Sequence, residues 1–149
     1  MADIQQLTQF LPIHQRSEGE DRYIEFLSES LKDNFEADNY QFSFLSFHMF
    51  FMYFVYVTLW KVRKINNKDF QKAIYLVGKD KEKRFEEANS PFDFSFYNEG
   101  QIIRLLKLLH CDNCDIGNFT SSVKLRNNSC HSNGSIVIKD LKSYENETD

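Results

Sequence analysis

Residues 44–60 read FLSFHMFFMYFVYVTLW, and this apolar run decides the fold class. It is slightly shorter than the ~20 residues that a membrane-spanning helix usually needs. Lys61, Arg63 and Lys64 follow it, as basic residues follow a membrane anchor. A helix that is apolar on every side also fits the centre of a helical bundle. We therefore expect a buried core helix and no membrane contact, with a membrane-associated protein as the minor alternative.

Capping and periodicity predict helices on both sides of this run. Ser17 and Glu20 have the spacing of a capping box, and apolar residues then recur at three and four positions up to Phe35, which predicts a helix of about five turns. Asp38 or Asn39 is expected to cap the long helix, which ends near Lys64. A short helix is expected at 4–10, another after Asn67 up to Gly78, and one or two helical turns within 79–89. An Asn98–Gln101 capping box predicts a helix at 98–110. Two further helices are expected from Thr120 to about His131 and at 136–144.

Two stretches between these helices predict irregular structure. Phe92–Phe96 alternates with period two, which is typical of an extended segment, and its Phe side chains are expected to enter the core. Cys111–Gly117 is expected to be a loop. Together the patterns predict an all-α bundle of four to five main helices with short connections, forming one domain over residues 1–149. Residues 1–16 would be an N-terminal arm and 145–149 a polar tail.

Composition agrees with this fold and restricts the partners. The chain has 149 residues, 42% of them hydrophobic, which is enough for one sizeable core, and its 5 Gly and 2 Pro argue against a turn-rich β fold. The net charge of −4 makes the whole molecule no obvious polyanion binder. Lys61–Arg84 nevertheless carries nine bases against three acids, and 101–142 carries six against three. A nucleic-acid contact would use these parts, although solvated helix faces are the better explanation of the first run taken alone.

The three cysteines are Cys111, Cys114 and Cys130. Their odd number and the lack of a visible signal peptide predict a cytoplasmic protein with reduced thiols. Cys111 and Cys114, with His110 nearby and Cys130 downstream, leave a structural zinc site open as an alternative. We expect no metal, because the second half of a zinc ribbon is missing.

The residues that suit chemistry lie near the C-terminal end, at 123–134. His131 supplies an imidazole, a group that in general exchanges protons near neutral pH, and the guanidinium of Arg126 is a permanent planar cation matched to phosphate oxygens. Asn127 would bind a phosphate or orient His131. Residues five apart on a helix are separated by about 140° around its axis. The pair therefore works only if His131 lies past the helix end or if two copies of the motif face each other.

The segment Arg126-Asn127-Asn128-Ser129-Cys130-His131-Ser132-Asn133-Gly134 resembles the signature of the HEPN superfamily, the higher eukaryotes and prokaryotes nucleotide-binding domains. The resemblance covers residues 17–144, and only 123–134 are specific. It implies a metal-independent, cofactor-free endoribonuclease of toxin or phage-defence type, with motifs paired across a homodimer and an antitoxin as a further partner. The RNA 2′-hydroxyl would attack the neighbouring phosphate, which leaves 2′,3′-cyclic-phosphate and 5′-hydroxyl ends. The resemblance implies Arg126, His131 and Asn127 as catalytic residues and Lys124, Asn128, Ser129 and Asn133 as RNA contacts.

Non-catalytic and purely structural interpretations of the same residues are the alternatives. A non-catalytic HEPN module that binds RNA, a nucleotide or a partner protein is the main alternative. Arg126 and His131 also suit an ordinary helix C-terminus closed by Asn133-Gly134. Arg104 and His110 form a second Arg–His pair, which we interpret as unrelated because a leucine-rich core stripe separates them. His48 is expected to be a core histidine.

Overall fold

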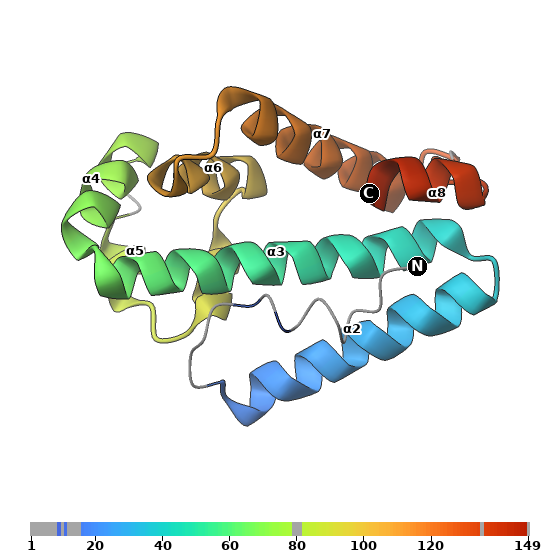
Figure 1. Ribbon diagram of the computed structural model, residues 1–149, viewed down its shortest axis with the longest axis horizontal. Coiled ribbons are helices and arrows are strands. Elements are labelled where there is room, and N and C mark those ends of the chain that lie inside the picture. The colour runs from blue at the N-terminus through green and yellow to red at the C-terminus, as the bar shows by residue number, and fades with distance from the viewer. Residues whose placement is uncertain (1–8, 10, 12–15, 79–81, 135, 149) are drawn as a thin grey trace. The chain divides into compact units, whose positions relative to one another are not determined.

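A computed structural model describes residues 9, 11, 16–78, 82–134 and 136–148 of the chain (Figure 1). These residues contain helices and no strand, which confirms the all-α prediction. The α-helices are α2 (Glu18–Glu36), α3 (Tyr40–Ile65), α4 (Asn67–Val77), α5 (Glu82–Glu87), α6 (Glu99–Arg104), α7 (Asn113–Cys130) and α8 (Leu141–Thr148), and the 3-10 helices are η3 (Pro91–Phe96) and η4 (Leu105–Leu109). The helix expected at 4–10 lies, except for Gln9, outside the described residues.

The chain packs as two compact units. The first combines residues 1–51 with 121–149, and the second is formed by 52–120. Both α3 and α7 contribute residues to each unit. The assignment of 1–149 to a single domain stays a prediction.

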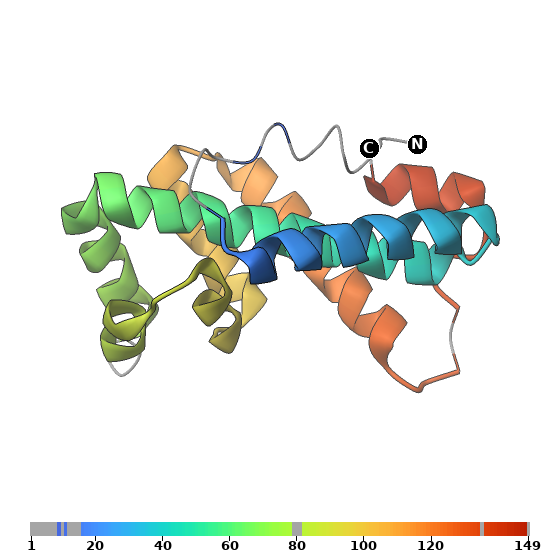
Figure 2. The same ribbon diagram turned by 90° about the horizontal axis from the view of Figure 1, so that it is seen from below.

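In the first unit, α2 and the first half of α3 form a hairpin that turns at residues 37–39 (Figures 1 and 2). Its core consists of Leu27, Leu31 and Phe50, with Tyr23 and Phe47 packed against them. The Ser30 and Ser46 hydroxyls, 2.8 Å apart, join the two helices by a hydrogen bond. A second apolar cluster, which ties α8 and the end of α7 to α3, contains Phe44, Ile138, Tyr144, Phe35, Tyr40, Leu45 and Leu125.

The second unit is built around aromatic rings. Phe94 lies in its centre, with ring centroids 5.3 Å from Phe85, 5.8 Å from Trp60 and 6.1 Å from Phe70. Aromatic pairs at such distances stabilise a core beyond the area they bury. The Tyr97 ring stacks on Phe85 with centroids 3.8 Å apart. These contacts fix α4, α5 and η3 against the second half of α3.

The extended segment predicted at Phe92–Phe96 is wrong, because these residues lie in η3. The Asp93 carboxylate accepts hydrogen bonds from the backbone N–H groups of Ser90 (3.0 Å) and Asn89 (2.7 Å), and Pro91 occupies the first turn. A carboxylate at the third position and a proline at the first both favour a helical turn. The core role of the segment is confirmed by Phe94, which is fully buried, whereas Phe96 is 72% exposed.

The capping box predicted for α2 is confirmed. The Glu20 carboxylate accepts from the Ser17 backbone N–H (2.8 Å), and the Ser17 hydroxyl accepts from the Glu20 N–H (3.2 Å). Gly78 ends α4 as predicted, but the N-cap of α4 is Asn66, one residue before the predicted position, and its side chain accepts from the Asp69 N–H (3.3 Å).

The last helix lies later than predicted. The sequence predicts a helix at 136–144, whereas α8 runs from Leu141 to Thr148 and takes up most of the predicted polar tail. Asp140 sets its start, because the Asp140 carboxylate accepts from the Ser143 N–H (2.8 Å). Ile138 precedes this cap and lies in the core.

The long apolar helix is present as predicted. By length and composition α3 is a candidate for crossing a membrane, and 61% of its most apolar 18-residue window is buried inside the fold. Core helices of soluble proteins have the same length and composition, and the burial of α3 favours the core interpretation. Phe42, Met49 and Ile65 of α3 are exposed on its surface, at 60%, 40% and 73%.

Candidate functional site

The candidate site occupies the end of α7 and the segment that follows it. The start of α7 differs from the prediction, because Asn113–Gly117 belongs to the helix and not to a loop. The Asp112 carboxylate accepts from the Asp115 N–H (2.9 Å), and the Asp115 carboxylate accepts from the Asp112 N–H (3.3 Å). These bonds form a reciprocal cap in which two aspartates replace the usual Ser and Glu.

The C-terminal end of α7 lies where the sequence predicts it. The helix ends at Cys130, so His131 lies just beyond it. The Asn133 N–H donates to the His131 carbonyl (2.7 Å), and Gly134 has a φ of 76°, a left-handed conformation that glycine adopts without strain. The imidazole is therefore carried by a tight bend and not by a regular helix, which is the first of the two geometries that the five-residue spacing allows.

Gln41 of α3 holds both ends of this bend by hydrogen bonds. Its side-chain N–H group donates to the Ser129 carbonyl (3.1 Å), and its side-chain oxygen accepts from the Val137 N–H (2.7 Å). The Ser129 carbonyl belongs to the last turn of α7, where backbone acceptors lack helical partners. One half-buried amide thus fixes the residues on either side of His131 and Asn133.

The first half of α3 runs antiparallel to the second half of α7. Gln41 meets Ser129 at one end, and the Nδ1 atom of His48 lies 3.5 Å from the Ser122 hydroxyl at the other. On a helix, residues 122, 126 and 129 share one face because they are spaced by four and three. Arg126 therefore lies on the face of α7 that is turned toward α3, and its side chain is half-buried.

The predicted residues differ in their exposure. Arg126 and Asn127 are half-buried, and the exposed ones are Lys124, Asn128, His131 and Asn133. Ser129 is 7% exposed, and its hydroxyl donates to the Leu125 carbonyl (2.9 Å). The Ser129 side chain thus serves the packing of α7, and no hydroxyl hydrogen remains to donate to an RNA chain.

The charge around the motif is entirely positive in sequence. From Ile116 to Lys139 there is no acidic residue, whereas the segment contains Lys124, Arg126, His131 and Lys139. The net charge of the chain is −4, and residues 39–68 likewise lack acidic residues, so the run at 116–139 is not unique. It suits a polyanion better than the molecule as a whole does.

The competing residues are placed as follows. His48 is buried beside the rings of Phe44 and Phe51, which confirms the core interpretation. His110 ends η4 in a left-handed conformation, and the leucines before it include buried Leu105 and Leu106, so the unrelated Arg104–His110 pair is indeed separated by core. Within the described ranges, no three His, Cys, Asp or Glu side chains gather as metal ligands.

Sequence reasoning missed Gln41. Nothing near Gln41 in the sequence signals its role, since its partners lie 88 and 96 positions away. The one available signal is its polarity at the edge of an otherwise apolar helix.

No protein-family model matches the chain, and no match was found among curated proteins or solved structures.

Proposed function

We propose that the protein is a metal-independent endoribonuclease of HEPN type, acting as a homodimer in the cytoplasm. The observation that carries the proposal is the placement of the two reactive groups. The exposed His131 follows the end of α7, and the half-buried Arg126 lies just over one turn before it on a helix that Gln41 attaches to α3. Such a held arginine and an accessible imidazole are what phosphodiester cleavage without a metal requires.

The proposed reaction is an internal transesterification. The imidazole of His131 takes the proton from an RNA 2′-hydroxyl, and the 2′-oxygen attacks the adjacent phosphorus. The bond from phosphorus to the 5′-oxygen then breaks, and His131 of the partner subunit gives that oxygen a proton. The Arg126 guanidinium stabilises the negative charge on the non-bridging oxygens, and Asn127 supports the phosphate.

The RNA strand would contact the exposed polar face that continues from the motif. Lys124, Asn128 and Asn133 are exposed around it, and the lysine offers a cation to a neighbouring phosphate. Ser129 contributes through the carbonyl that Gln41 binds, and so acts on the position of the bend.

The products test this proposal. Purified protein is incubated with a labelled RNA in excess EDTA, and the ends are identified by treatment with phosphatase and polynucleotide kinase. We expect 2′,3′-cyclic-phosphate and 5′-hydroxyl ends. RNA that is bound but remains intact would instead identify a non-catalytic HEPN module, and cleavage that EDTA abolishes would contradict the proposed chemistry.

A further inference from the structure

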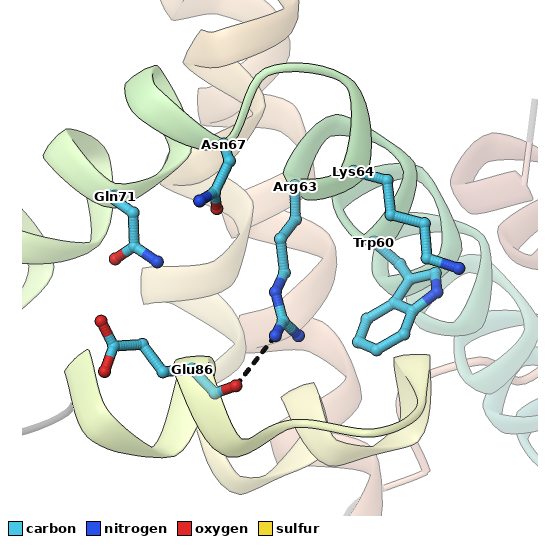
Figure 3. A pocket seen from close by; sticks show the side chains of 6 residues that line it. All are labelled: Trp60, Arg63, Lys64, Asn67, Gln71 and Glu86. Carbon is cyan, nitrogen blue, oxygen red and sulfur yellow. Dashed lines mark hydrogen bonds between the residues drawn. The ribbon is translucent and has the colours of Figure 1, made fainter.

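The second unit contains a cleft that the Arg126–His131 motif does not use. Its volume is about 460 Å³, in the range of small-molecule binding sites. The cleft is lined by Trp60, Arg63, Lys64, Asn67, Gln71 and Glu86 (Figure 3). These residues come from the end of α3, the first turns of α4 and the end of α5.

Two positive charges line the cleft, one on each side of the Trp60 ring in the view of Figure 3. The Arg63 guanidinium donates to the backbone carbonyls of Glu86 (2.9 Å) and Ala88 (3.0 Å), which fixes its position but does not neutralise its charge. The Lys64 ammonium lies 5.1 Å from the centroid of the Trp60 ring. Within the described part of the chain, neither cation forms an ion pair with a carboxylate. Both cations are therefore available to bind an anionic group.

The side of the cleft across from Trp60 carries two hydrogen-bond acceptors. Figure 3 shows the Gln71 amide and the Glu86 side chain together, across the cleft from Trp60 and Lys64. Among the described residues, the buried Gln71 side-chain oxygen has no hydrogen-bond partner, which is unfavourable in a folded protein. The Glu86 carboxylate likewise has no partner among the described residues. This side therefore lacks a donor.

We propose that the cleft binds a nucleoside 5′-phosphate, with the phosphate at Arg63 and Lys64 and the donors of the base at Glu86. Such a ligand brings an anion to the two cations and amino donors to the carboxylate. Guanine presents two neighbouring N–H donors on one edge, and these match the two oxygens of a carboxylate. The cleft therefore prefers guanine over bases with a single donor. The ligand is either a free nucleotide or the 5′ end of an RNA strand.

Trp60 reports directly on binding, because it is the single tryptophan of the chain and lines the cleft. The full-length protein is titrated with GMP while its tryptophan fluorescence is recorded. We expect a saturable change with a Kd below about 1 mM. UMP and phosphate-free guanosine should each bind at least about tenfold more weakly, because each lacks one of the two matched groups. A fluorescence signal that does not saturate with GMP, or equal affinity for GMP and UMP, would overturn the proposal.

Two variants test which residues bind the two ends of the ligand, and a third serves as a control. Lys64→Ala should weaken GMP and UMP alike, and Glu86→Gln should weaken GMP selectively. Both side chains are exposed, so the fold is expected to persist. The control is Lys83→Ala, which removes the same charge from α5 at a lysine 3.6 Å from Glu87 and outside the cleft lining. Equal losses in Lys64→Ala and Lys83→Ala would reduce the interaction to general charge attraction and refute the site.

The same titration separates this site from the nuclease motif. Arg126→Ala and His131→Ala should leave the Kd for GMP unchanged, whether or not the protein cleaves RNA. Competition by an oligonucleotide with a 5′-phosphorylated guanosine identifies an RNA end as the ligand. Binding of GMP without such competition identifies a free nucleotide.

Discussion

Gln41 is the residue on which the geometry of the candidate site depends most. Gln41→Ala removes the bonds to Ser129 and Val137, each worth about 0.5–1.5 kcal/mol. We expect urea unfolding to show a loss of about 1–3 kcal/mol. RNA cleavage should fall further than this loss explains, since the bend carrying His131 becomes mobile.

Gln41→Glu is the matched comparison for that change. A carboxylate still accepts from the Val137 N–H but cannot donate to the Ser129 carbonyl. Its stability should therefore fall between those of Gln41→Ala and the unchanged protein. Wild-type stability in Gln41→Ala, together with unchanged protection of the Val137 amide from hydrogen exchange, would show that these bonds do not hold the bend.

At this scale the candidate residues could be picked out from the sequence, but the contacts that hold them could not. Arg126 and His131 stand out because their side chains have properties that few residues share. The burial of Ser129 was not predictable, because it follows from how α7 packs on α3. Gln41 was missed for the same reason, since its role arises from contacts between segments far apart in sequence.

Among the elements, the start of α2, marked by a Ser-x-x-Glu capping box, was predictable, whereas helix starts marked by an aspartate were not. Ser17 and Glu20 follow the common pattern, and α2 begins as predicted. At Asp112, Asp93 and Asp140 an aspartate makes the cap, and there α7, η3 and α8 were misplaced or missed. The long helix was recognised because its run of seventeen mostly apolar residues is a stronger signal than any single cap.

The Asp140 cap makes the start of α8 sensitive to acid. Hydrogen bonds from the Ser143 backbone and hydroxyl hold the pKa of Asp140 below its usual range. A group whose pKa is lowered in the folded state stabilises the fold above its unfolded pKa, about 3.9 for Asp. That contribution is lost as the pH falls through the lower folded value.

Asp140→Asn tests the acid sensitivity, since an amide oxygen still caps the helix but does not titrate in this range. We expect stabilities close to wild type at pH 7 and a smaller loss in the variant when the pH is lowered to 3, measured by urea unfolding. Parallel pH profiles for the two proteins would show that this carboxylate does not couple α8 to pH.

For the whole molecule, the proposal requires a dimer that brings two motifs together. The first unit exposes apolar side chains on α3, where Phe42 directly follows Gln41 and Met49 lies two turns later on the same face. This apolar surface adjoins Gln41, which holds the motif. We therefore expect a second copy of the chain to cover it, because that would bring the two motifs close together. Burying one Phe side chain contributes about 1.5–3 kcal/mol.

Phe42→Asp should therefore shift the protein toward monomers in light scattering and reduce RNA cleavage in parallel. The control is Leu76→Asp, which places the same charge at an 86% exposed position of α4 in the second unit. If the unaltered protein is a monomer at micromolar concentration, or if Leu76→Asp has the same effect, this surface is not the dimer interface.

The most direct test of the central claim compares two double variants in the EDTA cleavage assay. One is Arg126→Ala with His131→Ala. The other is Arg104→Ala with His110→Ala, and both Arg104 and His110 are exposed. We predict that the first loses at least about 100-fold in cleavage rate, as removal of a proton-transfer group and a charge-stabilising group requires. The second should cleave at the wild-type rate. Equal cleavage by both double variants would contradict the account.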